Sequence, residues 1–263
     1  MRPAKYPKDV MLFLYDPDKR FVHVLVELRN ERGALADVAA KVSRLGLDIL
    51  NGLTSAEPGQ PAGIWSFFAE CVDKDLQASE IQKELGRSKH VISVRVGESD
   101  GGLLTDSFHF PLRFTPGRTA VGFNPTSIAS MFRRVVSTFG SGGQVIVYEE
   151  GRAVGKEGGK FLLSAIGRAT ILSKISRVGD LLSGWGWGVV ESIEVDKGIS
   201  NVQVRVTHCF ESSGAESAVP TCHFMRGMLE GLFETVAGNP MGSTETICAS
   251  QGQESCEFTI FRR

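Results

Sequence analysis

The sequence has no apolar run long enough to cross a membrane. Its longest apolar stretches, residues 10–15 and 21–28, are far shorter than the roughly 20 residues that a membrane-spanning helix needs. No N-terminal stretch has the pattern of a secretory signal peptide. These absences predict a cytoplasmic protein that does not enter the membrane.

An excess of charge of either sign is also missing. The 29 basic residues nearly balance the 30 acidic ones, which gives a net charge of −1. Proteins that bind nucleic acid directly expose a basic surface, so no such binding is expected.

Cysteine is scarce, and the count of 5 is odd. Without a secretory signal, an odd count favours reduced thiols over disulfides. Cys71 and Cys209 are expected to be buried without a functional role.

Recognisable catalytic motifs are absent as well. Residues 151–157 resemble a phosphate-binding loop, but three residues separate the glycines where four are needed, and Glu157 replaces the magnesium-binding Ser or Thr. The glycine-rich residues 183–188 precede a predicted strand, whereas a dinucleotide-binding fingerprint follows one. No Ser-His-Asp arrangement or paired-carboxylate motif stands out. The sequence therefore predicts no catalytic residues and a protein that is not an enzyme.

With 263 residues, the chain is longer than a usual single domain, and 42% hydrophobic with 22% charged residues is typical of a globular protein. Residues 98–102 have the composition of a linker. We therefore predict a first domain over residues 1–98, a linker over residues 99–117 and a second domain over residues 118–263.

The first domain alternates between strand and helix patterns. A short strand at residues 11–14 precedes six elements, which are predicted from apolar periodicity and turn residues. They are strands at 21–28, 48–55, 63–72 and 90–96, with helices at 35–45 and 75–85. The order βαββαβ predicts a ferredoxin-like α+β unit.

That order, together with Gly33 in the first strand-to-helix turn, resembles the ACT domain over about residues 20–97. The resemblance implies a regulatory module that often binds an amino acid at this turn. The matching positions are Asn30, Gly33, Ala34 and Leu35, where a glycine lets a ligand approach backbone N–H groups. The alternative is that Gly33 only fits a tight turn and that the unit serves for pairing.

The second domain combines helices with mainly antiparallel strands. The patterns predict a hairpin through residues 108–114 and 118–123, a helix at 128–139, a strand at 144–148 and a helical region at 159–182. They then predict strands at 185–195 and 201–210, an amphipathic helix from Cys222 that ends before Pro240, and strands at 244–249 and 255–261. This is an α+β domain.

Three of the five cysteines lie in its last stretch, with the spacing Cys222-x22-Glu245-x2-Cys248-x7-Cys256. Thiolates bind Zn²⁺ well, and a carboxylate can complete a tetrahedron. Such a metal would join the helix that starts at Cys222 to the following hairpin. The alternative is that these cysteines are small buried hydrophobic residues.

The same stretch resembles the 4-vinyl reductase domain family, which also forms the aromatic-sensing domain of phenol-responsive transcription activators. The family pattern Cys-x4-Gly-x3-Gly, followed by Glu-x2-Cys-x7-Cys, is met by Cys222, Gly227, Gly231, Glu245, Cys248 and Cys256. The resemblance extends over about residues 118–261. It implies a fold of the NO-signalling/Golgi-transport type, zinc on the Cys and Glu positions, and dimers.

Three thiolates and one carboxylate carry a formal charge of −4, so a bound Zn²⁺ ion would leave the site with a net charge of −2. The four ligands would leave no open coordination position on the metal. Zinc is therefore expected to be structural.

The second domain is also predicted to contain an apolar pocket for a small apolar or aromatic ligand. Its walls would be Met225, Met228 and Leu229 on the Cys222 helix and, facing them, Trp185 and Trp187. Core packing is the alternative for the tryptophans.

These observations together predict a homodimeric regulatory small-molecule-binding protein with a structural zinc site. Two alternatives stay open. The 4-vinyl reductase resemblance also admits a subunit of a tetrapyrrole vinyl-reducing enzyme, and its broad fold also occurs in protein-assembly adaptors. Arg152 or Arg226 is a further candidate, as an anchor for an anionic ligand. The sequence names neither the ligand nor the pathway.

Overall fold

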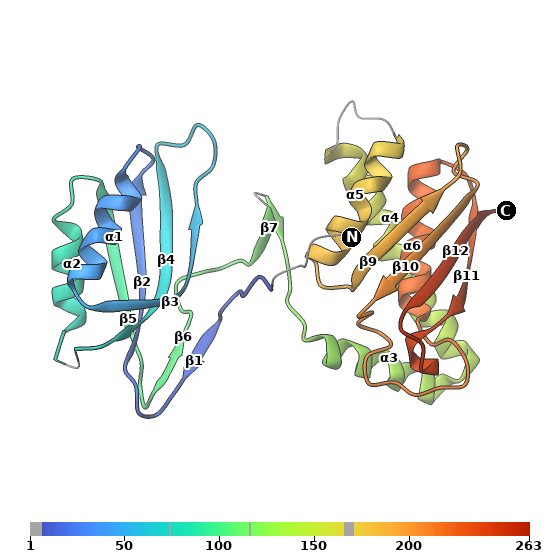
Figure 1. Ribbon diagram of the computed structural model, residues 1–263, viewed down its shortest axis with the longest axis horizontal. Helices are drawn as coiled ribbons and strands as arrows, with labels where there is room; N and C mark the ends of the chain where they lie inside the picture. Colours follow the sequence, from blue (N-terminus) through green and yellow to red (C-terminus); the bar gives the residue numbers. More distant parts are fainter. Residues whose placement is uncertain (1–6, 74, 116, 166–170) are drawn as a thin grey trace. The chain divides into compact units, whose positions relative to one another are not determined.

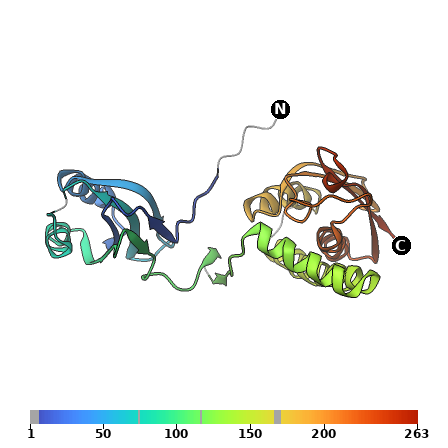
Figure 2. The same cartoon turned by 90° about the horizontal axis from the view of Figure 1, so that it is seen from below.

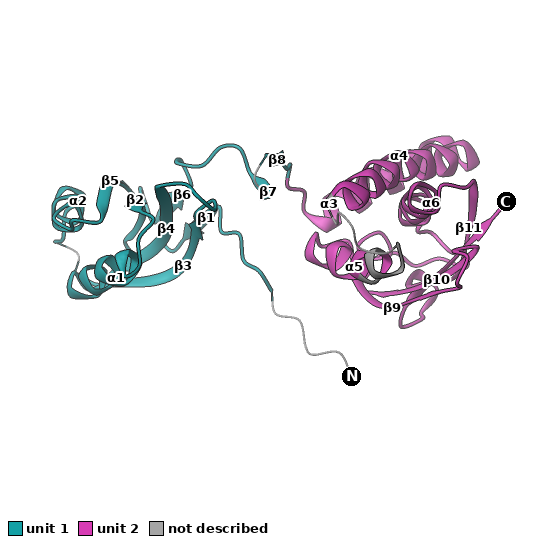
Figure 3. Ribbon diagram, turned by 90° about the horizontal axis from the view of Figure 1, so that it is seen from above, with its two compact units in different colours: residues 1–121 teal, residues 122–263 magenta. Residues whose placement is uncertain are grey.

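The computed structural model describes residues 7–73, 75–115, 117–165 and 171–263. The chain divides into two compact units, Met1–Val121 and Gly122–Arg263 (Figure 3). Within the described residues, no helix combines the length and the apolar character that a membrane span requires.

The first unit is built on a four-stranded sheet in the order β3-β4-β2-β5, in which every neighbouring pair is antiparallel. Two helices cover one face of this sheet (Figure 1). The elements are β2 (Phe21–Arg29), α1 (Ala34–Arg44), β3 (Leu47–Ser55), β4 (Ala62–Cys71), α2 (Ala78–Gly86) and β5 (Val91–Glu98). Their order along the chain is the βαββαβ that the periodicity predicts.

The core of this unit follows from the alternation of residues in β2. Val22, Val24 and Val26 are buried beneath Val38 of α1 and Ile81 of α2. Side chains of successive strand residues point to opposite faces, so the residues between these valines lie on the second face of the sheet.

A short antiparallel pair packs near one end of that second face. β1 (Phe13–Tyr15) pairs with β6 (Leu103–Thr105), and Leu104 is buried against Phe21 and Phe68. A strand is thus observed at residues 13–15, where the sequence predicts one at 11–14. The predicted linker residues contain β6 and also β7 (Arg113–Thr115), which pairs with β8 (Arg118–Thr119).

The second unit has a four-stranded antiparallel sheet in the order β11-β12-β10-β9. α5 packs against β9 and α6 against β11 and β12, while α4 lies against α6 on the side away from the sheet (Figures 2 and 3). The elements are α3 (Pro125–Phe139), α4 (Ser141–Ala165), α5 (Ile171–Gly184), β9 (Val189–Val195), β10 (Asn201–Thr207), α6 (His223–Ala237), β11 (Met241–Ile247), a 3-10 turn (Ala249–Gln251) and β12 (Cys256–Arg262).

Two predictions of local structure are wrong here. Residues 144–148 form part of α4, although their β-branched side chains favour a strand. The strand predicted from Trp185 begins only at Val189, because Gly186 and Gly188 have φ angles of 83° and 149°, outside the extended region. The helix predicted over residues 159–182 includes residues 166–170, which lie outside the described part of the chain.

Glycines allow α4, the helix that contains residues 144–148, to lie directly against α6. An added Cβ at Gly155 of α4 would lie 2.0 Å from the Met228 carbonyl oxygen, and one at Gly227 of α6 would lie 2.0 Å from the Tyr148 oxygen. Only glycine allows two helix backbones to come so close. The same applies to Gly151 and Gly231. This contact helps to position α6, the helix that begins directly after Cys222.

Candidate metal centre and adjoining cavity

Three fully buried thiols meet where α6, β11 and β12 come together. Cys222 precedes α6, Cys248 follows β11, and Cys256 begins β12. The Cys222 Sγ atom lies 3.6 Å from that of Cys248 and 3.7 Å from that of Cys256, and the last two are 3.9 Å apart. A tetrahedron with metal–sulfur bonds of about 2.3 Å has edges of roughly 3.8 Å. The three sulfur atoms thus fit one face of a tetrahedral metal site.

Glu245 supplies the fourth candidate ligand atom. Its Oε2 atom accepts a hydrogen bond of 2.9 Å from the Cys222 N–H, whereas its Oε1 atom is buried without a hydrogen-bond partner. One ligand atom from each of Cys222, Glu245, Cys248 and Cys256 can be chosen so that all lie within 4.8 Å of one another. A buried, unpartnered carboxylate oxygen beside three thiols is what a bound cation would satisfy.

Burial and the neighbouring thiol both shift the pKa of Glu245. Burial, and next the hydrogen bond and charge of Cys248, raise the pKa of Glu245 to about 8. Cys222 is affected in the same way, since its sulfur neighbours, led by Cys209, raise its pKa. A divalent cation would reverse both effects, because it favours the charged forms of the carboxyl and thiol groups.

Cys209 borders the same cluster. It is buried, as predicted, but its Sγ atom lies 3.8 Å from that of Cys222, so it is not remote from the site. The spacing of the sequence motif gave no sign of this proximity. Cys71, in contrast, is buried in the core of the first unit.

The N-terminus of α6 points its backbone donors at two carboxylates, of which Glu211 is buried and Glu245 is half-buried. Glu211 accepts hydrogen bonds of 2.9 Å from both Phe224 N and Met225 N, while Glu245 accepts the one from Cys222 N. Burial raises the pKa of Glu211 to about 8 despite these two donors. The positive end of the helix dipole stabilises negative charge here. The role of Glu211 could not be predicted from the sequence, because it lies outside the cysteine motif.

An aromatic cluster adjoins this end of α6. The Phe224 ring is stacked between Phe132, with centroids 4.7 Å apart, and Trp187, with centroids 5.4 Å apart. Phe210 meets Phe224 edge-on. Trp187 is thus half-buried and packs against the core, which is closer to the core-packing alternative for the tryptophans. Trp185 is half-buried, with its ring centroid 6.4 Å from that of Phe161.

An open cavity of about 420 Å³ lies between α3, the start of α4 and the loop that leads to α6. Its apolar wall includes Phe132, Val136 and Val219, and its polar wall includes Arg133 and Glu211. The other lining residues are Ala129, Ser137, Gln144, Gly214, Ala215, Glu216, Ser217, Pro220, Thr221 and His223. The predicted pocket residues Trp185, Trp187, Met225, Met228 and Leu229 are not among them. Met225, Met228 and Leu229 are buried along α6 in the main core.

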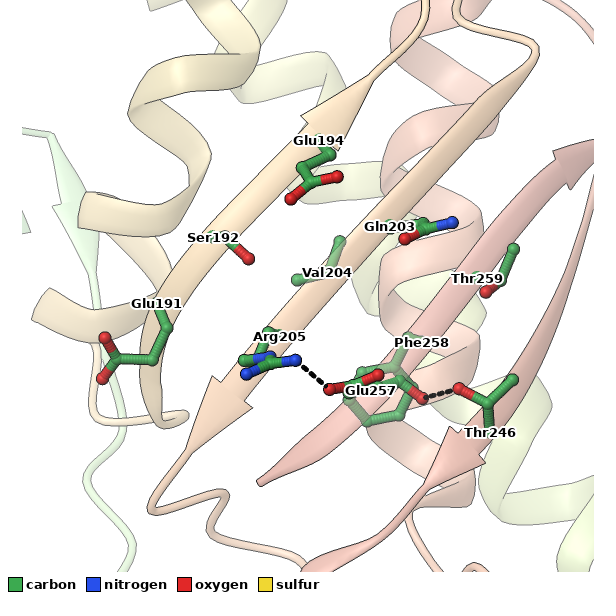
Figure 4. A pocket seen from close by; sticks show the side chains of 10 residues that line it. All are labelled: Glu191, Ser192, Glu194, Gln203, Val204, Arg205, Thr246, Glu257, Phe258 and Thr259. Carbon is green, nitrogen blue, oxygen red and sulfur yellow. Dashed lines mark hydrogen bonds and ion pairs between the residues drawn. The ribbon is translucent and has the colours of Figure 1, made fainter. Parts of the chain in front are cut away.

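A wider groove of about 630 Å³ runs over the outer face of the sheet in the second unit (Figure 4). Its strands present polar side chains, and Arg205 is paired with Glu257 at 2.6 Å. Apolar ligands favour pockets with apolar walls, so the cavity beside Phe132 suits them better than this groove.

Asn30 and Gly33 lie together in the turn between β2 and α1. Gly33 has φ of 85°, and an added Cβ would find no atom within 4 Å. The Asn30 side chain donates to the Gln60 carbonyl oxygen at 3.0 Å. The turn thus requires glycine for its backbone conformation and has open space beside it. A ligand-binding role of Asn30 and Gly33 stays a prediction.

Comparison with known proteins bears on the metal centre. Residues 202–262 match the family model of the 4-vinyl reductase domain. This matched region contains all four candidate metal ligands, and the predicted 4-vinyl reductase domain is confirmed for these residues. An uncharacterized protein of Methanocaldococcus jannaschii is 26% identical over 146 residues, which are 55% of this chain and 80% of that protein.

Three solved structures are also similar to part of the chain. The phenol-responsive sensory domain of the transcription activator PoxR, solved with phenol, is 12% identical, with a TM-score of 0.49 over 55% of this chain and 77% of that one. A vinyl-4-reductase family protein of M. jannaschii is 18% identical, with a TM-score of 0.40 over 54% and 84% of the two chains. A trafficking protein particle complex subunit 3 of Naegleria fowleri, bound to palmitic acid, is 11% identical, with a TM-score of 0.42 over 53% and 95%.

Proposed function

We propose that this protein is a regulatory small-molecule-binding protein. In the proposal, the second unit holds a structural zinc ion on Cys222, Glu245, Cys248 and Cys256. It binds a small aromatic or otherwise apolar ligand in the cavity beside Phe132. The match of residues 202–262 to the 4-vinyl reductase domain supports a sensing role. The protein acts in the cytoplasm and as a regulator, not as an enzyme.

The zinc assignment is supported by the sulfur spacing of 3.6–3.9 Å and by the unpartnered Glu245 Oε1 atom. Three thiolates select zinc over magnesium or calcium, which prefer oxygen ligands. Four protein ligands complete a tetrahedron, so no position is left for a substrate. Bound zinc therefore supplies folding free energy, and the chain's own residues form the ligand site.

The ligand assignment rests on one observation, which is that the cavity and the metal cluster share a segment of chain. Thr221 and His223 line the cavity and flank the candidate ligand Cys222. Glu211 lines it too and holds the first turn of α6 through two backbone N–H groups. Zinc would thus hold this wall of the cavity without touching the ligand. The volume of about 420 Å³ lies within the roughly 300–1,000 Å³ of small-molecule pockets.

A variant that fills the mouth of the cavity tests this function. Val219 lines the cavity and is exposed, so Val219→Trp should occupy the ligand's space without disturbing the core. Binding of phenols and indoles, followed by thermal shift, should weaken at least tenfold while the zinc content stays unchanged. Val154→Trp places the same ring at an exposed position of α4 outside the cavity and should bind like the wild type. Equal loss in both variants, or no ligand among these compounds for the wild type, would contradict the proposal.

We also propose that the first unit is an ACT-type regulatory module that pairs with a second copy of the chain. An amino acid would meet the turn that contains Asn30 and Gly33, where there is open space around the Gly33 backbone. Isothermal titration calorimetry with a panel of amino acids tests this assignment. Absence of heat for every amino acid would leave the unit a pairing module only.

A further inference from the structure

The first unit contains a buried histidine that the proposed function does not use. His23 lies on the second face of the β2–β5 sheet, and its side chain is 1% exposed. Its ring stacks on that of Phe68, with centroids 4.4 Å apart, and Phe108 covers it at 4.6 Å. In the sheet, His23 is directly opposite Gly97, and an added Cβ at Gly97 would be 3.5 Å from the Phe108 ring. The segment that follows β6 therefore encloses His23.

The hydrogen bonds of His23 involve only one of its ring nitrogens. The Nε2 atom lies 2.8 Å from the Ser66 hydroxyl oxygen. The Nδ1 atom is buried without a hydrogen-bond partner and is 3.7 Å from Oδ1 of Asp106. When Nε2 donates its proton to Ser66, Nδ1 presents a lone pair toward a carboxylate. That juxtaposition is unfavourable unless a cation or a proton lies between the two groups.

Asp106 and His109 are held in a fixed geometry beside this nitrogen. The backbone N–H groups of Phe108 and His109 donate to Asp106 Oδ1 at 3.0 and 3.2 Å, which closes a tight turn. His109 Nδ1 is 2.9 Å from Asp106 Oδ2, and its Nε2 atom is buried without a hydrogen-bond partner. Two imidazoles and one carboxylate thus converge, and each imidazole has a ring nitrogen without a partner.

We propose that His23, Asp106 and His109 bind a divalent first-row transition metal ion such as Zn²⁺ or Fe²⁺. One ligand atom from each residue lies within 4.8 Å of the others. Ligand atoms about 2.1 Å from one metal ion are separated by roughly 3.0–3.4 Å, so the gap between His23 Nδ1 and Asp106 Oδ1 closes by a few tenths of an ångström. Imidazole nitrogens favour transition metals over Mg²⁺ and Ca²⁺. Ser66 orients the His23 ring through its contact with Nε2, as partners of metal-bound histidines do.

This site differs from the cysteine cluster in its coordination. Three protein ligands leave at least one position for water or a small ligand, as in zinc sites with exchangeable ligands. The side chains of Asp106 and His109 are 14% and 24% exposed, which gives solvent access on their side of the ion. Metal binding would also join the segment after β6 to the central strand β2.

Metal titration of the 263-residue protein tests the site. The protein is dialysed against zinc-free buffer without a chelator, so that the cysteine cluster keeps its metal, and Zn²⁺ binding is then followed by calorimetry and by elemental analysis. Long-range ¹H–¹⁵N NMR signals of the imidazole nitrogens are recorded in parallel. We expect the nitrogen signals of His23 and His109 to shift on saturation. Asp106→Asn and His109→Gln should each weaken this binding at least tenfold, because they keep the shape of the side chain but remove a ligand.

His90→Gln is the matched control. His90 lies in the same unit and close to the carboxylate of Glu31, at 3.3 Å, but outside the three-residue cluster. This variant should bind like the wild type. The proposal is overturned if Zn²⁺ leaves the His23 and His109 signals unchanged, or if Asp106→Asn and His109→Gln both retain wild-type binding. If either variant fails to fold, the imidazole nitrogen signals of the wild-type protein alone test the proposal. These signals report on His23 and His109, so they are informative whether or not the cysteines hold zinc.

Discussion

Cys248 joins the candidate metal cluster from the end of β11, and its removal would break two of the three short sulfur contacts. Its Sγ atom lies 3.6 Å from Cys222 and 3.9 Å from Cys256. At the residue scale, stability in this part of the chain therefore depends on atoms that are separated by 26 and 8 positions in the sequence. A metal ion would join them without any covalent bond between the cysteines.

Replacement of Cys248 by Ser should lower the zinc content by about one ion per chain, which is the ion that the cysteine cluster would hold. It should also lower the melting temperature, because a structural zinc ion contributes its binding free energy, about 10 kcal/mol or more in small zinc domains, to folding. Elemental analysis and thermal unfolding measure both effects. Cys71→Ser is the control, since it alters a buried cysteine of the other unit and should retain zinc. A wild-type protein that binds no zinc would refute the metal site.

Tyr148 contributes a pH dependence at the contact between α4 and α6. Burial, followed by the hydrogen bond and the charge of Glu230, raises the pKa of Tyr148 to about 12. A folded-state pKa above the unfolded value of about 10 means that this stabilisation is complete below pH 10 and is lost as the pH rises toward 12. Ultraviolet titration should show one tyrosinate that forms near pH 12, and Tyr148→Phe should lack it. Ionisation of every tyrosine near pH 10 would contradict this prediction.

At the scale of elements, the pair α4 and α6 determines where the metal cluster lies. Their backbones are in contact through glycines on both helices, so α6 can take only one position along α4. The buried carboxylate of Glu230 on α6 is paired with Arg152 of α4 at 3.3 Å, and Glu234 is paired with Arg152 at 2.8 Å. Breaking such a buried pair leaves a charge unsatisfied, so these contacts add to the specificity of the helix pairing.

Substitution of two glycines of α4 by alanine should distinguish the effect of the close helix contact on stability from the effect of helix propensity. Gly155→Ala would place a methyl group 2.0 Å from the Met228 oxygen and should destabilise the protein by about 1–3 kcal/mol or more. Gly158→Ala, on the same helix, meets only Leu232 Cδ1 at 4.0 Å and should stabilise by roughly 0.5–1 kcal/mol. Chemical denaturation measures both values. Equal effects of the two substitutions would show that the helices do not depend on this close approach.

At the scale of the whole molecule, the four-stranded sheets have open edges. β3 is an edge strand of the first sheet, and Ile49, Leu50 and Leu53 on it are each more than 40% exposed. An exposed, apolar edge strand favours pairing with another chain. Most assemblies of identical chains have two-fold symmetry, so a second copy is the expected partner.

Sedimentation at micromolar concentration should therefore give the mass of a dimer. Leu53→Lys should shift the protein toward the monomer, because a charge on an edge strand opposes pairing. Val154→Lys introduces the same charge at an exposed position on α4 and should leave the dimer intact. A wild-type monomer would count against pairing through β3.

Local periodicity determined much of this protein. The alternation in β2 and the apolar positions of α1 predict the first sheet and its helices, because each pattern reports which side of an element is buried. The spacing of Cys222, Glu245 and Cys248 likewise predicts a candidate metal site, and the thiols and the carboxylate do lie together. The first pattern is contained in a few neighbouring residues, whereas the second is a spacing that extends from Cys222 to Cys256.

The tertiary structure decided the rest, for reasons that no local pattern contains. Residues 144–148 belong to a helix that lies against α6, and glycines far along the chain in α6 permit this close contact. Cys209 and Glu211 approach the N-terminus of α6 only once β10 is in place beside β12. His23 faces Asp106 because the segment after β6 folds back over the sheet. Each of these contacts joins residues distant in sequence, so it depends on how whole elements pack and not on the propensity of either segment.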